Sequence, residues 1–168
     1  LGIPAGTNRA LAESRGRWIA IMDHDDIALP AKLTRQIAWF EAHPEAGGIA
    51  ARTALIDTAG AEIGGDFTLH KPAEHRAFTA FSQAANLGSH LFRREVVEAL
   101  PRREQFSFSS DFDFIARAAE RWPVAALPEV LFQYRVHPGQ TSQVRRSEQL
   151  AAEGVIRILT ALRRSGRA

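Results

Sequence analysis

A short apolar run that ends directly in a cluster of acids is the feature that most limits the folds this chain can adopt. Residues 17–22 read Arg-Trp-Ile-Ala-Ile-Met, and Asp23-His24-Asp25-Asp26 follows without a gap. A nearly continuous apolar run of this length is typical of a strand that is buried on both faces of a parallel sheet. Leu29-Pro30 then places a proline in the first turn of a helix. A strand, an acidic loop and a helix in this order predict an α/β sheet.

Strands and helices are expected to alternate along the rest of the chain. On the last helix, Leu150, Val155, Ile158, Leu159 and Leu162 are expected to face inward, with the arginines outward. The apolar patterns and turn residues predict strands over 48–56, 89–92 and 124–136, the last broken at Pro128. They predict helices over 30–43, 71–86, 94–100, 111–122 and 147–164. On the first of these helices, Leu33, Ile37 and Phe40 are expected on one face.

Composition excludes several classes of protein. The chain has 168 residues, which suits one domain, and its 21 basic and 19 acidic residues leave a net charge of +2. The arginines are scattered in pairs, so we expect no nucleic acid partner. With no cysteine there is no disulfide, thiolate metal site or cysteine nucleophile. No apolar run approaches the ~20 residues of a membrane span, and no signal peptide is visible. We expect a cytoplasmic protein, with the inner face of the membrane as a second location.

The acidic cluster is a candidate cation site. Its three carboxylates repel one another, and a hard cation such as Mg²⁺ or Mn²⁺ would offset that repulsion. Its place also fits, because ligands of open α/β sheets bind beyond the carboxyl ends of strands. The other interpretation is that Asp23, Asp25 and Asp26 cap the helix that begins near Pro30, and the residues alone leave both open. His24 is expected to face solvent as a spacer.

Two further positions carry chemistry only in combination with the cluster. Asp111 and Asp113 begin a predicted helix, where acidic side chains favour the helix dipole without any catalytic role. His137 follows the strand that ends near Arg135, and a lone histidine there is ordinarily a surface residue. A histidine with two aspartates is nevertheless a suitable octahedral metal set when phosphate oxygens complete it.

Taken in order, these motifs resemble family-2 glycosyltransferases of the GT-A fold over residues 2–142. The resemblance implies a partial, Rossmann-like mixed sheet flanked by helices, in a GT-A domain (1–142) that lacks its N-terminal, base-binding part. A C-terminal amphipathic helix (143–168) would pack on that domain or lie at a membrane surface. The matching stretches are residues 6–16, 19–36, 57–60, 86–94, 110–117 and 127–142, which hold the acidic cluster, Asp111, Arg117 and His137.

The resemblance also implies an activity and its residues. A sugar would pass from a nucleoside-diphosphate-sugar to an acceptor hydroxyl with inversion, assisted by Mg²⁺ or Mn²⁺. The donor's diphosphate would bind at Asp23, Asp25 and Asp26. Asp25, Asp23 and His137 would hold the metal. Asp111 would be the general base. Asp113 and Arg117 would position the helix, and the acceptor would be a saccharide, a lipid-linked molecule or a protein, with a peripheral membrane contact for the protein as a whole.

Two departures from the family pattern keep an alternative open. Thr7 stands where the family commonly has arginine, and Ser110 stands where it commonly has glutamate before the base. The chain opens at Leu1, without methionine and in what reads as a loop, which we interpret as a fragment edge. A non-catalytic, truncated remnant that acts as a binding module is therefore the alternative. A metal-dependent phosphohydrolase is a third interpretation, but the six histidines form no pattern typical of that class.

Overall fold

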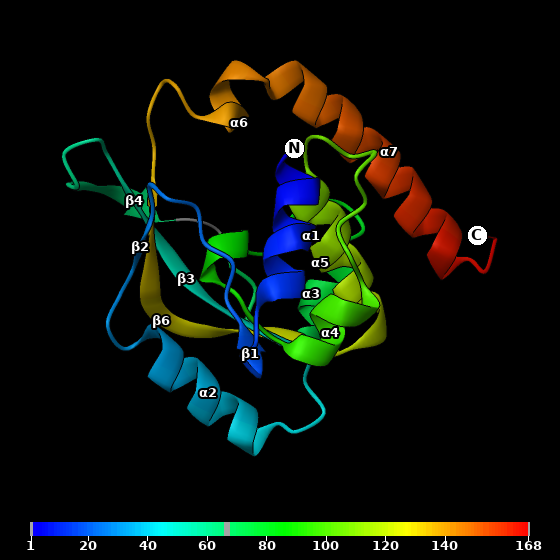
Figure 1. Ribbon diagram of the computed structural model, residues 1–168, viewed down its shortest axis with the longest axis horizontal. Helices are drawn as coiled ribbons and strands as arrows, with labels where there is room; N and C mark the ends of the chain where they lie inside the picture. The colour runs from blue at the N-terminus through cyan, green and yellow to red at the C-terminus, as the bar shows by residue number, and fades with distance from the viewer. Residues whose placement is uncertain (1, 66–67, 168) are drawn as a thin grey trace.

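A computed structural model describes residues 2–65 and 68–167 of the chain. The described residues form one mixed sheet with helices on both faces (Figure 1). The strands run in the order β1-β5-β3-β6-β2, and β4 pairs with β3 outside that path. The mixed α/β architecture predicted from the sequence is confirmed. The strands are β1 (Trp18–Ile19), β2 (Ile27–Ala28), β3 (Gly48–Ile56), β4 (Glu62–Gly65), β5 (Leu91–Arg93) and β6 (Val124–Arg135).

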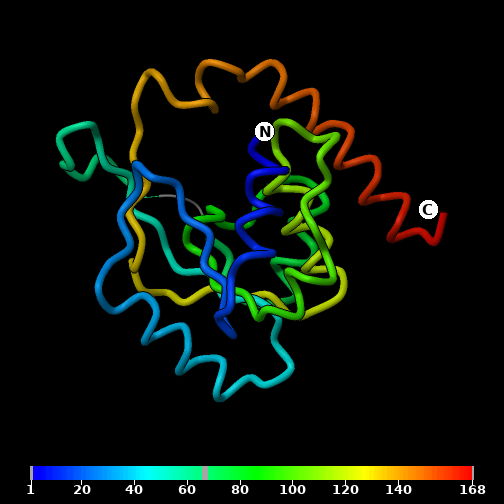
Figure 2. Tube along the Cα trace, viewed as in Figure 1, coloured from blue at the N-terminus to red at the C-terminus, as the bar shows by residue number. Residues whose placement is uncertain are grey.

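The helices divide between the two faces of the sheet. Figures 1 and 2 show α2 on one side and α1, α4 and α5 gathered on the other, with α7 along the outer rim beside α5. The helices are α1 (Ile3–Glu13), α2 (Lys32–Ala42), α3 (Pro72–Phe78), α4 (Arg94–Ala99), α5 (Ser110–Arg121), α6 (Thr141–Val144) and α7 (Arg146–Arg164), with a single 3₁₀ turn, η1, at Leu87–Ser89.

The core follows this division into two layers. Phe40 of α2 packs with Ile49, Leu91 and Leu127 on one face of the sheet. Phe114 of α5 packs with residues of α4 and β5 on the other face. Burial of such side chains contributes about 1.5–3 kcal/mol each, so the two apolar layers fix the sheet between the helices. The ends of the strands are thereby held in place for the loops that follow them.

Strands β3 and β6 are the parallel centre of the sheet. Pairing runs from Gly48 with Val124 to Ile56 with Arg135, and the register shifts where Ala51 pairs with Leu127 and Arg52 with Val130. The shift skips Pro128 and Glu129, because proline has no amide hydrogen for a ladder bond. The break predicted at Pro128 is therefore an irregularity within one continuous strand.

The first apolar run departs from its predicted form. Only Trp18 and Ile19 are in strand conformation, antiparallel to β5 at the edge of the described sheet. Met22 is 50% exposed, so the expected burial on both faces is wrong. The physical reason is that an edge strand has a neighbour on one side only. The chain start also differs, because α1 begins at Ile3 where a loop was expected, with Pro4 in its first turn.

Two helices face differently from their predicted orientation. On α2, Phe40 is buried, but Leu33 is 49% exposed while Lys32 and Gln36 are buried. Gln36 is buried because its side-chain amide donates to the carbonyl oxygens of Ile49 and Ser89, and that pairing offsets the cost of burying a polar group.

On α7 the expected inner face is wrong for Leu150, Val155 and Ile158, all of which are exposed. The fully buried residues are Ile156 and Thr160. The helix predicted over 71–86 is also shorter than expected, since α3 ends at Phe78 and Phe81 is 69% exposed. The polar stretch after β3 contains the short strand β4, and Asp66, its expected end, lies outside the described residues.

Candidate functional site

Arg135, at the end of β6, fastens the acidic loop to the sheet. Its backbone N–H donates to Asp26 Oδ1 (2.9 Å), and its side-chain Nε donates to the carbonyl oxygen of Asp25 (2.9 Å). Its Nη1 reaches the carbonyl oxygen of Asp57 at 2.8 Å, in the turn after β3. One arginine thus joins three segments that lie far apart in the sequence. This join brings the loop of residues 23–26 beside the residues that follow β6.

Asp25 and His137 meet at this join. Asp25 Oδ2 lies 3.0 Å from His137 Nε2, and each side chain is about a quarter exposed, at 26% and 28%. Partial burial acts to raise the pKa of Asp25, but the hydrogen bond from His137, the backbone N–H of Asp25 and the nearby histidines together outweigh it, and the net pKa is lowered. The backbone N–H of His137 donates to Gln140 Oε1 (2.8 Å), which fixes the position of this residue. Asp25 therefore presents a carboxylate that keeps its charge.

Asp26 plays a different part from its neighbour. It is 8% exposed, with Oδ1 taken by Arg135 N–H and Oδ2 buried without a partner among the described residues. Burial raises the pKa of Asp26 to about 6, although the Arg135 hydrogen bond opposes that rise. The buried Asp26 thus holds the acidic loop to the end of β6 through its bond to the Arg135 backbone. The idea that the acids cap the next helix is not supported, because the cap of α2 is Ala31 and no side chain bonds there.

Asp23 and His24 lie on the open side of the loop, and both are exposed. Although Asp23 reaches solvent, the protein packed around it and the negative charges of Asp25 and Asp111 raise its pKa. Asp23 therefore lies in electrostatic range of both the Asp25 side and Asp111. The loop faces Asp111 across this position.

Asp111 lies in the first turn of α5 and is held by a side chain from elsewhere. Gln83 Nε2 donates to Asp111 Oδ2 at 2.8 Å. The cap position of α5 is Ser109, with φ of 57°, a left-handed conformation that is uncommon for serine, and no side chain caps the helix. Asp111 therefore does not act as a cap. One oxygen of the Asp111 carboxylate therefore accepts a hydrogen bond from the Gln83 amide. That amide nitrogen can donate a hydrogen bond but cannot accept a proton at neutral pH.

Arg102 is buried beneath the two acids and was missed by sequence reasoning. It is 4% exposed, its Nη1 donates to the carbonyl oxygen of Ser110 (2.7 Å), and its guanidinium lies 4.4 Å from the ring centre of Phe114. Burial lowers the pKa of Arg102 to about 10, and Asp111, Asp113 and Asp23 oppose that change. A fixed positive charge therefore lies within range of the carboxylates of both Asp23 and Asp111.

One sequence feature bears on the residues that were missed. Asn8 lies in one of the family-like stretches, and it accepts from the backbone N–H of Arg102 and donates to its carbonyl oxygen, at 2.8 and 2.9 Å. Asn8 was thus a pointer to Arg102, whereas nothing in the sequence singled out Gln83. Asp113 is fully buried and bonded to Arg117 at 2.8 Å, and Arg117 also donates to the carbonyl oxygen of Pro101. These contacts suit the positioning role expected for that pair.

The donor set fits a divalent cation in part. No group of three or more His, Asp or Glu side chains converges as a metal cage in residues 2–65 and 68–167. Two donors do converge, Asp25 Oδ2 and His137 Nε2, at 3.0 Å. Adjacent ligands of an octahedral ion with ~2.1 Å bonds lie about 3 Å apart. Mg²⁺ is ordinarily held by one or two carboxylates with water and phosphate oxygens, so this pair suits an ion that arrives with a diphosphate.

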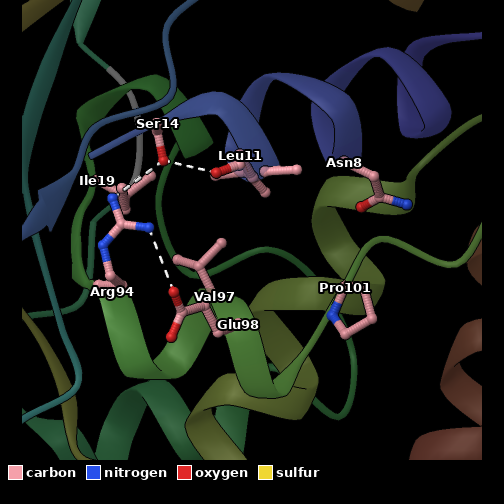
Figure 3. A pocket seen from close by; sticks show the side chains of 9 residues that line it. Asn8, Leu11, Ser14, Ile19, Arg94, Val97, Glu98 and Pro101 are labelled. Atoms are coloured by element: carbon pink, nitrogen blue, oxygen red, sulfur yellow. Dashed lines mark hydrogen bonds and ion pairs between the residues drawn. The ribbon is translucent and has the colours of Figure 1, made fainter. Parts of the chain in front are cut away.

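Two hollows on the described surface bear on where the site lies. One, of about 430 Å³, is lined by Val136, His137, Pro138 and Gln143. The other, of about 230 Å³, lies between α1, α4 and the edge strand β1 (Figure 3). Figure 3 shows apolar side chains such as Leu11 and Val97 facing it, with Arg94 joined to Ser14 and Glu98 at its rim. We place the site at the hollow of about 430 Å³, because His137, the partner of Asp25, lines it.

The chain matches known glycosyltransferases at the level of sequence. The profile described as Glycosyl transferase family 2 matches residues 1–100. The chain is 26% identical to the amylovoran biosynthesis glycosyltransferase AmsE of Erwinia amylovora, over 99% of this chain and 63% of that protein. It is 28% identical to an uncharacterized glycosyltransferase of Methanocaldococcus jannaschii, over 81% of this chain and 48% of that protein. The chain thus spans about half to two thirds of the length of these relatives.

A solved structure shares the fold. Crystal structures of TarS from S. aureus superpose with a TM-score of 0.59 for one chain and 0.60 for a chain of residues 1–349. Sequence identity is 15% and 14%, over 88% and 90% of this chain, and over 26% and 44% of those chains. At this identity the likeness concerns the fold alone.

Proposed function

We propose that this chain, which belongs to glycosyl transferase family 2, carries the cation- and acceptor-side residues for transfer of a sugar from a nucleoside-diphosphate-sugar to an acceptor hydroxyl, with inversion. The observation that carries the proposal is the pairing of Asp25 with His137, 112 positions apart, beside an Asp111 that is oriented separately. Membership of the family indicates the reaction class. Within that reaction, Asp25 would bind the cation and Asp111 would act as the general base.

The donor side is built on Asp25 and His137. With Mg²⁺ or Mn²⁺ bound, the ion would offset the charge that develops on the departing diphosphate. Asp25 and His137 would hold that ion, with Asp23 on the open side of the same loop as the third candidate ligand. Arg135 keeps the loop in place, and Asp26 supports it from beneath through the Arg135 amide. Asp26 is thus part of the donor site as an anchor, while Asp25 presents its carboxylate outward.

The acceptor side is built on Asp111. As the acceptor oxygen attacks the anomeric carbon, its proton passes to Asp111 Oδ1, since Oδ2 is taken by Gln83. The new bond from oxygen to the anomeric carbon forms as the bond to the diphosphate breaks, and the diphosphate leaves with the electron pair. One displacement inverts the anomeric configuration. Gln83 orients the base, and the buried positive charge of Arg102 lies in electrostatic range of it.

The partners follow from this chemistry. The donor is a nucleoside-diphosphate-sugar, and the acceptor is the hydroxyl of a saccharide, a lipid-linked molecule or a protein. A relative named for amylovoran biosynthesis supports a role in polysaccharide biosynthesis. The alternative function is a non-catalytic module that retains cation binding. It is supported by Ser110 and Thr7, the two departures from the family pattern.

The experiment is a titration of Mn²⁺ with a panel of nucleoside-diphosphate-sugars, read as release of the nucleoside diphosphate. We expect metal-dependent release with one donor and its loss in Asp111→Asn. Binding of Mn²⁺ and nucleotide without release, in a protein that carries the full family domain, would favour the binding module. A generic phosphodiester should remain intact; its cleavage would favour a phosphohydrolase.

A further inference from the structure

The outer face of α7 carries no charge, which is unusual for a helix on a protein surface. From Ser147 to Ala161 each exposed residue is uncharged, and three are large and apolar: Leu150, Val155 and Ile158, exposed by 48%, 49% and 63%. The exposed small residues are Ala151 and Ala161. At 100° per residue these positions fall on one side of the helix. From Leu150 to Ala161, about 18 Å of helix, α7 therefore presents an apolar face to solvent.

Arg157 and Arg163 of α7 hold the helix to the body, whereas Arg146 at its start is exposed and Glu148 pairs with the preceding Arg145. Arg157 donates to the carbonyl oxygen of Phe81 (2.6 Å) and to Glu153. Arg163 bonds Glu120 of α5 at 2.8 and 3.0 Å. The opposite face buries Ile156, which packs with residues of α5. These pairs fix the rotation of the helix, so the apolar face cannot turn inward without breaking them.

Positive charge surrounds the apolar face. Residues 141–167 contain six arginines and two glutamates, a net charge of +4. Arg145 and Arg146 are exposed before the face begins, and Arg167 is exposed beyond its end. Two apolar side chains extend the surface: Val144 of α6 is 63% exposed, and Phe81, beside Arg157, is 69% exposed. A helix with this pattern suits the boundary between the headgroups and acyl chains of an anionic bilayer.

We propose that the outer face of α7 docks on an anionic lipid surface. The net charge of +4 decides against a second copy as the occupant, because pairing two such faces would bring like charges together, whereas anionic headgroups attract them. No helix in the described parts of the chain is long and apolar enough to cross a membrane. The contact is thus one of adsorption through α7. It does not rest on the proposed transfer chemistry.

The position of α7 gives the contact a functional reach. Only residues 138–145 separate His137 from α7, and α6 lies between them. Figure 1 shows α6 and α7 running on from the end of β6 along the rim of the molecule. A surface bound through α7 would hold the candidate site close to the bilayer, where a lipid-linked acceptor would be presented. The sequence predicted that the arginines of this helix face outward and that the helix could lie at a membrane surface. The contact proposed here is made by the apolar face of α7 instead.

Vesicle co-sedimentation of the whole 168-residue chain tests the docking. We expect pelleting with vesicles of phosphatidylcholine and phosphatidylglycerol in equal parts, much less with phosphatidylcholine alone, and weakening with salt. The double variant Val155→Asp/Ile158→Asp should lower partitioning at least about tenfold, because both side chains would lose apolar burial in the boundary. Circular dichroism should show the fold retained, since both positions are exposed.

Two control variants distinguish docking through this face from a general effect of added negative charge. Ile63→Asp makes the same change at a 56% exposed residue on β4 and should leave vesicle binding unchanged. Asp111→Asn should also bind as the wild type does, so failure of the transfer chemistry and failure of docking are distinguishable. Absence of binding to anionic vesicles, or an equal loss in Ile63→Asp, would overturn the proposal. A dimer in sedimentation velocity that Val155→Asp/Ile158→Asp dissolves would assign the face to a second copy and overturn it as well.

Discussion

Asp25 and Asp111 are two acids that both lie in electrostatic range of Asp23, and they differ in the partner that holds each one. Asp25 is paired with the imidazole of His137 at 3.0 Å, and Asp111 with the amide of Gln83 at 2.8 Å. An imidazole nitrogen can give up its hydrogen and become a metal ligand, whereas an amide nitrogen only donates. The Asp25 pair can therefore open to accept a cation, while the Asp111 pair orients one carboxylate oxygen and leaves the other for a proton.

The surroundings strengthen this difference. The Asp25 side is tied to the sheet by Arg135, which bonds the loop backbone and leaves the outward carboxylate available. The Asp111 side is underlain by the buried guanidinium of Arg102, fixed through Ser110 and Asn8. Electrostatic preorganisation of this kind is the usual source of catalytic effect. The two aspartates are thus distinguished by their partners, and changing one partner or one acid should affect one function and not the other.

The largest expected effect is on transfer in Asp111→Asn. Loss of a general base ordinarily costs 10²–10⁴-fold in rate, so we expect turnover to fall by about 10³-fold while binding of Mn²⁺ and donor is kept. Asp113→Asn is not a suitable control, because that residue is buried in an ion pair. Glu95→Gln, at an exposed acid in the first turn of α4, is the matched control and should be near neutral. Full activity in Asp111→Asn would show that Asp111 is not the general base.

A smaller effect is expected from the partner of Asp25. His137→Ala should reduce metal-dependent turnover by about 10–100-fold, with part of the loss regained at high Mn²⁺, as is typical when a ligand or its support is removed. His24→Ala, an exposed histidine in the acidic loop, serves as the control. Rate measurements across a Mn²⁺ series check this. A loss that does not change with Mn²⁺ concentration would mean that His137 acts on something other than the cation.

The partner of Asp111 should matter less than Asp111 itself. Gln83→Met keeps the length of the side chain but removes the donor, so the carboxylate loses its fixed orientation. We expect about a tenfold fall in kcat, because misorientation weakens general-base catalysis without removing it. Mn²⁺ binding should be unchanged, and this is the sharper readout. If Gln83→Met weakened Mn²⁺ binding as His137→Ala does, the two acids would belong to one undivided cluster.

The smallest effect is on stability, through Asp26. Its pKa is raised to about 6 in the folded protein, so the folded state holds its proton to higher pH than the unfolded state does. This contribution to stability is present below about pH 4 and is lost as the pH rises through 6. Asp26→Asn should therefore stabilise the protein at pH 7.5 by about 1 kcal/mol or more, with a ceiling near 3 kcal/mol from the size of the shift. Urea unfolding at pH 5 and pH 7.5 measures it, and an unchanged pH dependence in the variant would contradict it.

The sheet and the order of its elements could be predicted because they depend on local patterns. Residues 48–56 and 124–136 have the apolar content of buried strands, and both are strands. The strand predicted over residues 17–22 is longer than the observed β1, which covers only Trp18–Ile19. An apolar pattern does not show whether a strand has neighbours on both sides. For α7 the periodicity revealed an apolar stripe, but its direction depends on where Glu120 and the Phe81 carbonyl oxygen accept from the arginines.

The acids and His137 could be proposed as site residues from the sequence, whereas Gln83 and Arg102 could not. Asp25, Asp111 and His137 lie in motifs whose order identifies them. Gln83 and Arg102 carry no motif, and they reach Asp111 and Ser110 only after the chain has folded. A partner that is chosen by tertiary position leaves no mark in local spacing. This is why the sequence could propose the acids, while the division of labour between them depends on the structure.

Binding of Mn²⁺ in the presence of a nucleoside diphosphate, followed by electron paramagnetic resonance, tests that division most directly. It needs no turnover, and it compares the chain with Asp25→Asn and Asp111→Asn. The account predicts at least a tenfold loss of affinity in Asp25→Asn, since a carboxylate ligand becomes a neutral amide, and a change of less than about twofold in Asp111→Asn. Equal affinity in Asp25→Asn and the wild type, or an equal loss in both variants, would contradict it.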